Sequence, residues 1–94
     1  MVISHHNPDI RRVLLDEKLT ELALYAKSLC PEAEVETSTV QYEDEDGHLD
    51  VFPPPTLMEA EEEQIELALA ERAAQIFADT GLYLLCAVLD PTAR

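Results

Sequence analysis

The side chains in this sequence that could do chemistry are mostly carboxylates. Between Ser28 and Glu71 the chain carries fourteen Asp and Glu residues and no Lys or Arg. Acid–base catalysis by such groups requires two carboxyls in different environments, one of them desolvated and facing a cleft. Most of these acids fall on an expected helix face or hairpin tip, where water would reach them. No Ser or Cys nucleophile has a discernible partner either, so we expect a protein that is not an enzyme.

The acidic run Asp44–Gly47 is similar to a calcium loop in composition but not in spacing. Matching Asp44, Asp46 and Gly47 to the third, fifth and sixth positions of an EF-hand loop places Pro53 at the twelfth position, where a bidentate Glu is required. The run is therefore interpreted as a hairpin tip that lies in solvent.

The metal-capable His and Cys side chains do not fall at the spacings of zinc sites. They are His5, His6, His48, Cys30 and Cys86. No CxxC, HxxxH or HExxH spacing links them, and two glycines are too few for a glycine-rich phosphate loop. The sequence predicts no metal centre and no cofactor. We interpret the cysteines as reduced thiols of a cytoplasmic protein, because the start of the chain lacks the pattern of a signal peptide.

Size and composition predict one domain, residues 1–94. Hydrophobic residues make up 47% of the sequence, and the formal net charge is −14. Lys and Arg number 6 against 20 Asp and Glu, which disfavours direct binding to nucleic acid, because such binding depends on neutralising phosphates. The longest apolar run, Leu82 to Leu89, is far shorter than the ~20 residues that span a bilayer. We expect no membrane partner.

The first predicted helix covers residues 8–29. Asn7, Pro8 and Asp9 give a cap, a favoured first residue and an acid at the positive end of the helix dipole. Apolar residues then recur every three or four positions as far as Leu29. The helix should stop before Pro31, because a residue that precedes proline disfavours helical backbone angles.

A β-hairpin is predicted over residues 34–52. A two-residue turn at Asp46-Gly47 and a four-residue loop at 44–47 are both consistent with the sequence. Either would place two pairs of apolar side chains on one face of the hairpin and three other side chains on the opposite face. The first set is Val40, Tyr42, Leu49 and Val51, and the second is Gln41, Asp50 and Phe52.

A second helix is predicted over residues 57–80, with Thr56 and Glu59 as its capping box and Gly81 as its stop. One of its faces has small residues suited to close approach by another helix. This face consists of Ala60, Leu67, Ala74 and Ala78. The last element is a strand at 82–89, whose lack of alternation indicates burial on both faces.

The element order predicts an α+β two-layer sandwich, α-β-β-α-β. With Met1–Ser4 as a short leading strand, the order would match a ferredoxin-like variant. The excess of apolar side chains on the last strand leads us to expect a homodimer. Its expected interface contains Phe52, Tyr83 and Leu85.

The predicted function is a non-enzymatic interaction module that docks a basic partner through its acids. The expected docking residues are a stripe on the second helix and the hairpin tip. They are Glu59, Glu62, Glu63 and Glu66, with Asp44, Glu45 and Asp46. For the stripe itself, the simpler interpretation is a face that only solvates the helix. Mimicry of nucleic acid is a subtype of the docking hypothesis, and a regulatory domain that binds a small ligand or metal is the alternative to it.

Overall fold

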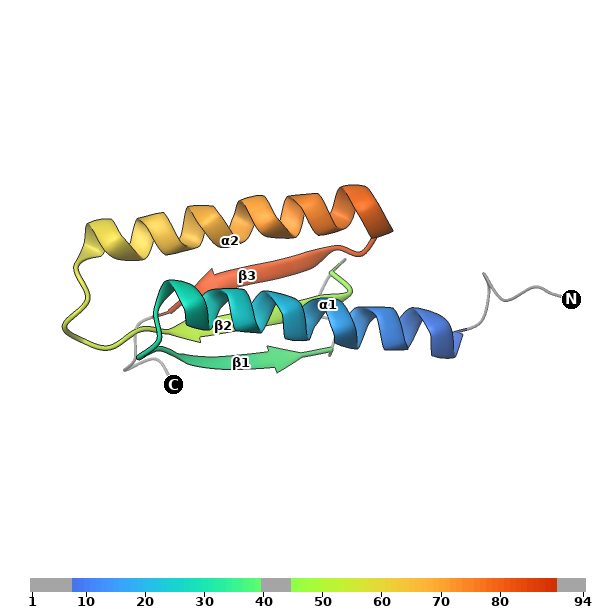
Figure 1. Cartoon of the computed structure of the whole chain (residues 1–94), viewed down its shortest axis with the longest axis horizontal. Coiled ribbons are helices and arrows are strands. Elements are labelled where there is room, and N and C mark those ends of the chain that lie inside the picture. Colours follow the sequence, from blue (N-terminus) through green and yellow to red (C-terminus); the bar gives the residue numbers. More distant parts are fainter. Residues whose placement is uncertain (1–7, 40–44, 90–94) are drawn as a thin grey trace, which may run out of the picture.

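Two helices lie on one face of a three-stranded sheet in the computed structural model, which describes residues 8–39 and 45–89 (Figure 1). The elements are α1 (Pro8–Leu29), β1 (Glu34–Ser38), β2 (Gly47–Phe52), α2 (Glu59–Thr80) and β3 (Leu84–Val88). This order and layering confirm the predicted α+β sandwich. Neither helix of the described ranges has the length and apolar character needed to cross a membrane.

The strand order is β1-β2-β3, with β1 antiparallel to β2 and β2 parallel to β3. The segment from β2 through α2 to β3 is therefore a βαβ unit with α2 as the crossover. A ferredoxin-like plan would insert a leading strand between β2 and β3, but these two strands pair directly. The predicted leading strand, Met1–Ser4, lies outside the described residues, and the described sheet has no place for it between β2 and β3. β3 is an edge strand of this sheet.

The hairpin is present, but both predicted turns are wrong. Ser38 pairs with His48 and Glu34 with Phe52, so Gly47 is the first residue of β2 and not part of a turn. A Cβ at position 47 would lie 3.0 Å from Leu19 Cδ1. Gly47 therefore serves close packing against α1 rather than chain reversal. Val40, Gln41 and Tyr42, which were predicted to share hairpin faces with residues of the second strand, lie outside the described residues.

The core lies between the helices and one face of the sheet. Its fully buried members include Leu22 of α1, Leu49 and Val51 of β2, and Leu69 of α2. α1 covers β1 and β2, whereas α2 covers β3 (Figure 1). The Arg72 guanidinium carbon lies 4.1 Å from the centre of the Tyr25 ring, which joins the two helices by a cation–π contact.

The start of α2 lies two residues later than predicted. Glu59 is its first residue, and the Met58 N–H donates to Glu61 Oε1 at 3.2 Å. Thr56 is not the cap, because residues 54–57 form a turn in which the Leu57 N–H donates to the Pro54 carbonyl at 3.0 Å. The predicted stop is confirmed, since Gly81 has φ 78° and its N–H donates to the Phe77 carbonyl.

We predict that Leu69→Ala lowers the free energy of unfolding by about 2–5 kcal/mol, because it leaves a cavity under α2. Leu67→Ala is the matched control on the same helix, and its side chain is 63% exposed. The control should change stability by no more than about 0.5 kcal/mol. Urea unfolding followed by circular dichroism measures both, and equal losses would contradict the packing described here.

Candidate functional site

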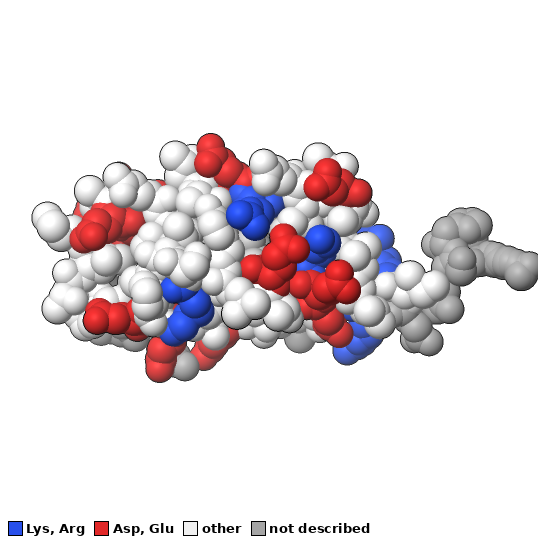
Figure 2. All heavy atoms as spheres, in the orientation of Figure 1, with Lys and Arg blue, Asp and Glu red and all other residues white. Residues whose placement is uncertain are grey.

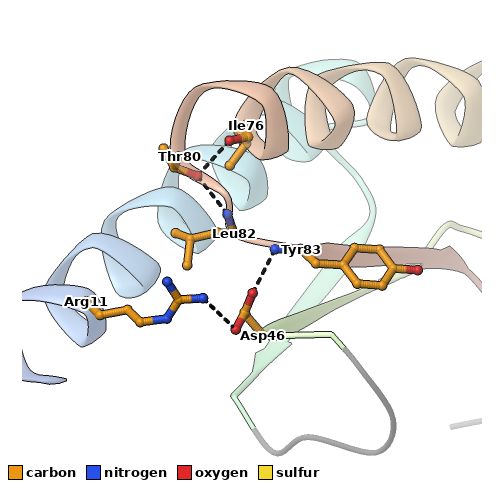
Figure 3. Close-up of polar contacts among 6 residues, drawn as sticks. All are labelled: Arg11, Asp46, Ile76, Thr80, Leu82 and Tyr83. Carbon is orange, nitrogen blue, oxygen red and sulfur yellow. Dashed lines mark hydrogen bonds and ion pairs between the residues drawn. The ribbon is translucent and has the colours of Figure 1, made fainter. Parts of the chain in front are cut away.

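A single carboxylate joins α1, β2 and β3 at one end of the sheet. Asp46 Oδ2 accepts a hydrogen bond from the Tyr83 N–H at 2.8 Å, and the Asp46 N–H donates to the Tyr83 carbonyl at 2.7 Å. Asp46 Oδ1 lies 3.0 Å from Arg11 Nη2 of α1. Figure 3 shows Asp46 between Arg11 and the Tyr83 backbone, with the Tyr83 ring pointing away from Arg11. We call this arrangement the Asp46 clamp.

The turn from α2 into β3 is held from its other side by Thr80. The Thr80 hydroxyl donates to the Ile76 carbonyl at 2.6 Å and accepts from the Leu82 N–H at 3.1 Å (Figure 3). Leu82 is fully buried beneath this turn. Together, Thr80 and the Asp46 clamp orient residues 80–83, so that the Tyr83 ring meets the Phe77 ring edge-on at 6.4 Å.

An apolar groove of about 440 Å³ lies between α2 and β3. One wall is formed by Ala70, Ala73, Ala74 and Phe77, and the other by residues 83–86. The alanines leave the space that a larger side chain would fill. Among the described residues, the lining contains no Asp, Glu, Lys or Arg. Phe77 is 54% exposed, Tyr83 43% and Leu85 39%. These large apolar surfaces meet water at the rim of the groove.

Cys86 lines the groove, and partial burial raises the pKa of its thiol to about 11. At neutral pH the thiol is therefore uncharged and a poor nucleophile. Cys30, the other cysteine, is buried next to the end of α1. Both cysteines are free thiols within the described residues, so neither contributes a disulfide there.

The acidic stripe and the groove wall share one face of α2. Glu59, Glu63 and Glu66 are exposed, and Glu62 beside them is half-buried. One continuous helical face, with steps of three or four residues, runs through Glu59, Glu63, Glu66, Ala70, Ala73 and Phe77. The face is acidic over the first half of α2 and apolar over the second half. We call the groove, its rim and the β3 edge the β3–α2 surface.

The hairpin-tip acids do not lie where they were predicted. Glu45 is only 3% exposed, and its Oε2 lies 3.9 Å from His48 Nδ1. Asp46 is held in the clamp, and Asp44 lies outside the described residues. The expectation that the tip is solvated is therefore wrong for Glu45 and Asp46, because both come directly before β2, which begins at Gly47.

His48 lies on the sheet face opposite the helices, with its Nε2 2.6 Å from Asp50 Oδ1. Together with Glu45 this places two carboxylates near one imidazole. Nevertheless, no group of three His, Cys, Asp or Glu side chains in residues 8–39 and 45–89 has an arrangement that could hold a metal ion.

The three residues predicted for a dimer interface fall in two places. Tyr83 and Leu85 lie at the groove, whereas Phe52 is 7% exposed and offers little surface. In the single chain β3 is an edge strand and Leu85 is exposed, so the predicted burial of the last strand on both faces would require a second molecule to cover it and stays a prediction. Sequence reasoning missed Ala70, Ala73 and Phe77, although it identified Ala74. The helical spacing of these residues was the available signal.

The basic side chains are concentrated on α1 and on the side of α2 that faces it. Within the described ranges the Lys and Arg ion pairs include Arg11–Asp46, Lys18–Glu21 and Arg72–Glu21. Lys27 instead donates to the carbonyls of Pro31 and Ala33. Figure 2 shows this side of the molecule, where blue side chains lie among red ones. None of these pairs involves the acidic stripe of α2.

We predict that Asp46→Ala lowers the free energy of unfolding by about 1–3 kcal/mol, because the Tyr83 N–H loses its acceptor. Arg11→Ala removes only the ion pair, and the Arg11 side chain is 57% exposed, so its cost should stay below about 1 kcal/mol. Urea unfolding of the two variants separates the contributions. Equal losses would mean that the ion pair, rather than the bond to the strand, gives the clamp its strength.

Comparison of the chain with protein-family models, with curated proteins and with solved structures finds no match. The functional argument therefore depends on the geometry of the β3–α2 surface.

Proposed function

We propose that this chain is a non-enzymatic protein-interaction module that docks through the β3–α2 surface. The observation that carries the proposal is an edge strand beside an uncharged groove with exposed Phe77, Tyr83 and Leu85 at its rim. Protein docking uses both features at once, since an added strand pairs with the edge while its side chains occupy the groove.

The composition of β3 supports this function. Natural sheets protect their edges with charged residues, proline or bulges, and the β3 sequence Leu84–Val88, LLCAV, has neither a charge nor a proline. A hydrophobic edge of this kind would promote uncontrolled aggregation unless a specific partner covers it. Because the chain carries a high net negative charge, its molecules repel one another, which limits association through surfaces other than β3.

The lining of the groove favours a protein partner over a substrate. Small-molecule sites combine an apolar wall with a few convergent polar groups that fix orientation. Here the described part of the wall is Ala, Phe and Leu, and the Cys86 thiol is uncharged. Tyr83 supplies the only side-chain hydroxyl among these lining residues. Shape and apolar contact, together with strand pairing, are the forms of recognition that this groove offers.

We predict that a photoreactive benzoylphenylalanine at position 77 forms discrete protein adducts in cells that express the chain. The same group at position 24 is the control, because Leu24 is similarly exposed but lies on α1. Leu85→Lys should abolish the adducts from position 77, because it places a charge at the rim of the groove. Adducts from position 24 alone, or adducts unchanged by Leu85→Lys, would refute the proposed docking surface.

A second candidate function is docking of a basic partner to the acidic stripe. The observation that favours it is the one-sided distribution of charge, since the ion pairs of the Lys and Arg residues lie on the α1 side. Like charges at neighbouring helical positions cost a few tenths of a kcal/mol each, and a basic partner would offset that cost. Nucleic-acid mimicry remains a subtype of this candidate.

We predict that a variant in which Glu59, Glu62, Glu63 and Glu66 are all changed to Lys no longer binds the basic proteins that the wild type retains from a native lysate at low salt. Retention by the wild type should fall steeply as salt is added. The control reverses four other exposed acids, Asp16, Glu17, Glu71 and Asp79, with the same change in net charge. Equal loss in both variants would show that only net charge matters. DNA that displaces no retained protein would exclude the mimicry subtype.

A further inference from the structure

The open edge of β3 presents the backbone groups of alternate residues. On the inner side, the Leu89 N–H donates to the Val51 carbonyl at 2.8 Å. Backbone groups alternate in direction along a strand. Odd-numbered residues therefore bond to β2, whereas the N–H and C=O groups of Leu84, Cys86 and Val88 point out of the sheet and can pair with an added strand.

The space beside this edge lies beneath α2. This helix covers β3, whereas α1 covers β1 and β2 (Figure 1). A helix is about 10 Å wide and neighbouring strands are about 4.8 Å apart, so a helix above an edge strand also extends over the place of the next strand. A second β3 would bring a second α2 into the same space. The edge therefore favours an extended segment that has no helix of its own above it.

The charged side chains on the groove side of α2 are all acids. Glu59, Glu63 and Glu66 lie on the helical face that continues into the apolar wall of the groove. Arg72 is the only Lys or Arg of α2, and it points to the α1 side, where its guanidinium lies over the Tyr25 ring. A segment under α2 would therefore meet an apolar wall along one half of its length and carboxylates along the other half.

The direction of α2 determines which end of the segment meets the carboxylates. α2 runs opposite to β3, because it crosses back between two parallel strands (Figure 1). Phe77 contacts Tyr83 at the start of β3, so the acids lie towards the end of β3. On an added strand, the side chains opposite Leu84 and Val88 would be about 13 Å apart. That length corresponds to about nine residues of α2, which moves the contact from Phe77 to the neighbourhood of Glu66.

We infer that the β3–α2 surface binds an extended segment of another protein in which Lys or Arg precedes a pair of apolar residues. The inference rests on the proposed function of that surface and specifies the chemistry of its partner. The segment pairs antiparallel with β3, which is the more stable direction per residue. In about seven residues, its first and third side chains meet the acidic stripe. Its fifth and seventh, opposite Cys86 and Leu84, enter the groove.

Charge complementarity selects this partner over a neutral strand. A neutral strand would leave the like charges of the stripe to repel one another, whereas basic side chains offset that repulsion and speed association. The charges also fix the orientation of the segment. In the reverse orientation, apolar side chains would cover carboxylates and remove them from water without a partner, which is unfavourable.

Selection from a random peptide library displayed on phage, with the purified full chain as bait, tests the inference. Enriched peptides should contain two apolar residues separated by one residue, with Lys or Arg two and four positions before the first of them. The variant with all four stripe acids changed to Lys should instead select Asp or Glu at those two positions. The control variant with four other acids changed to Lys should select the same basic peptides as the wild type. These control positions are Asp16, Glu17, Glu71 and Asp79.

Single substitutions keep the test informative if the stripe variant fails to fold. The readout is the dissociation constant of one enriched peptide, measured by fluorescence anisotropy. Ala70→Gln places an amide in the groove and should raise the constant at least about tenfold. Ala78→Gln makes the same change on an exposed part of α2 outside the groove lining and should leave the constant unchanged. Glu66→Gln should raise the constant about two- to fivefold.

The outcomes separate this inference from the proposed function. Enriched peptides with the apolar pair but no preference for Lys or Arg overturn the basic partner, and so does a basic preference that the stripe variant retains. In both cases docking of a strand in the groove survives. Basic peptides without the apolar pair, or an affinity that Ala70→Gln leaves unchanged, contradict the groove and therefore both claims. If no peptide is enriched, both fail together.

Discussion

The Asp46 clamp is the interaction on which the rest of this structure depends. The Asp46 carboxylate accepts a hydrogen bond from the Tyr83 N–H, and the Asp46 N–H donates to the Tyr83 carbonyl. The segment that enters β3 is thereby held at the start of β2. The contact lies at the end of the parallel β2–β3 pair, whose connection passes through the whole of α2. The Tyr83 ring is thereby directed to Phe77 and the rim of the groove.

Direct pairing of β2 with β3 determines what the surface of the protein can do. In a split βαβ plan another strand would lie between them, and β3 would be at the edge of the sheet in that plan as well. Here α2 crosses between adjacent strands, so that it lies above β3, the edge strand of the described sheet. The acidic first half of α2 and its apolar second half then lie along one line. The groove is a consequence of the strand order and of three alanines at helical spacing.

Local patterns in the sequence predicted the elements of this fold, whereas contacts between distant residues explain the errors. The helix periodicity of α1, the stop at Gly81 and the β-rich segments gave the order of elements correctly. The hairpin register could not be deduced, because Gly47 is needed beside Leu19 and Leu84 rather than in a turn. Asp46 resembled a solvated tip because its partners are Tyr83 and Arg11, both more than thirty residues away. The edge position of β3 could not be deduced either, because it is a property of the whole sheet.

Amide hydrogen exchange of β3 tests the central claim most directly. Leu85, Ala87 and Leu89, whose amides are directed at β2, should exchange slowly, and Leu84, Cys86 and Val88 should exchange fast. The account predicts this alternation because β3 is the edge strand of the described sheet and pairs with β2 on one side. Slow exchange of Leu84, Cys86 and Val88 in dilute solution would contradict the claim that this edge is open to a docking strand.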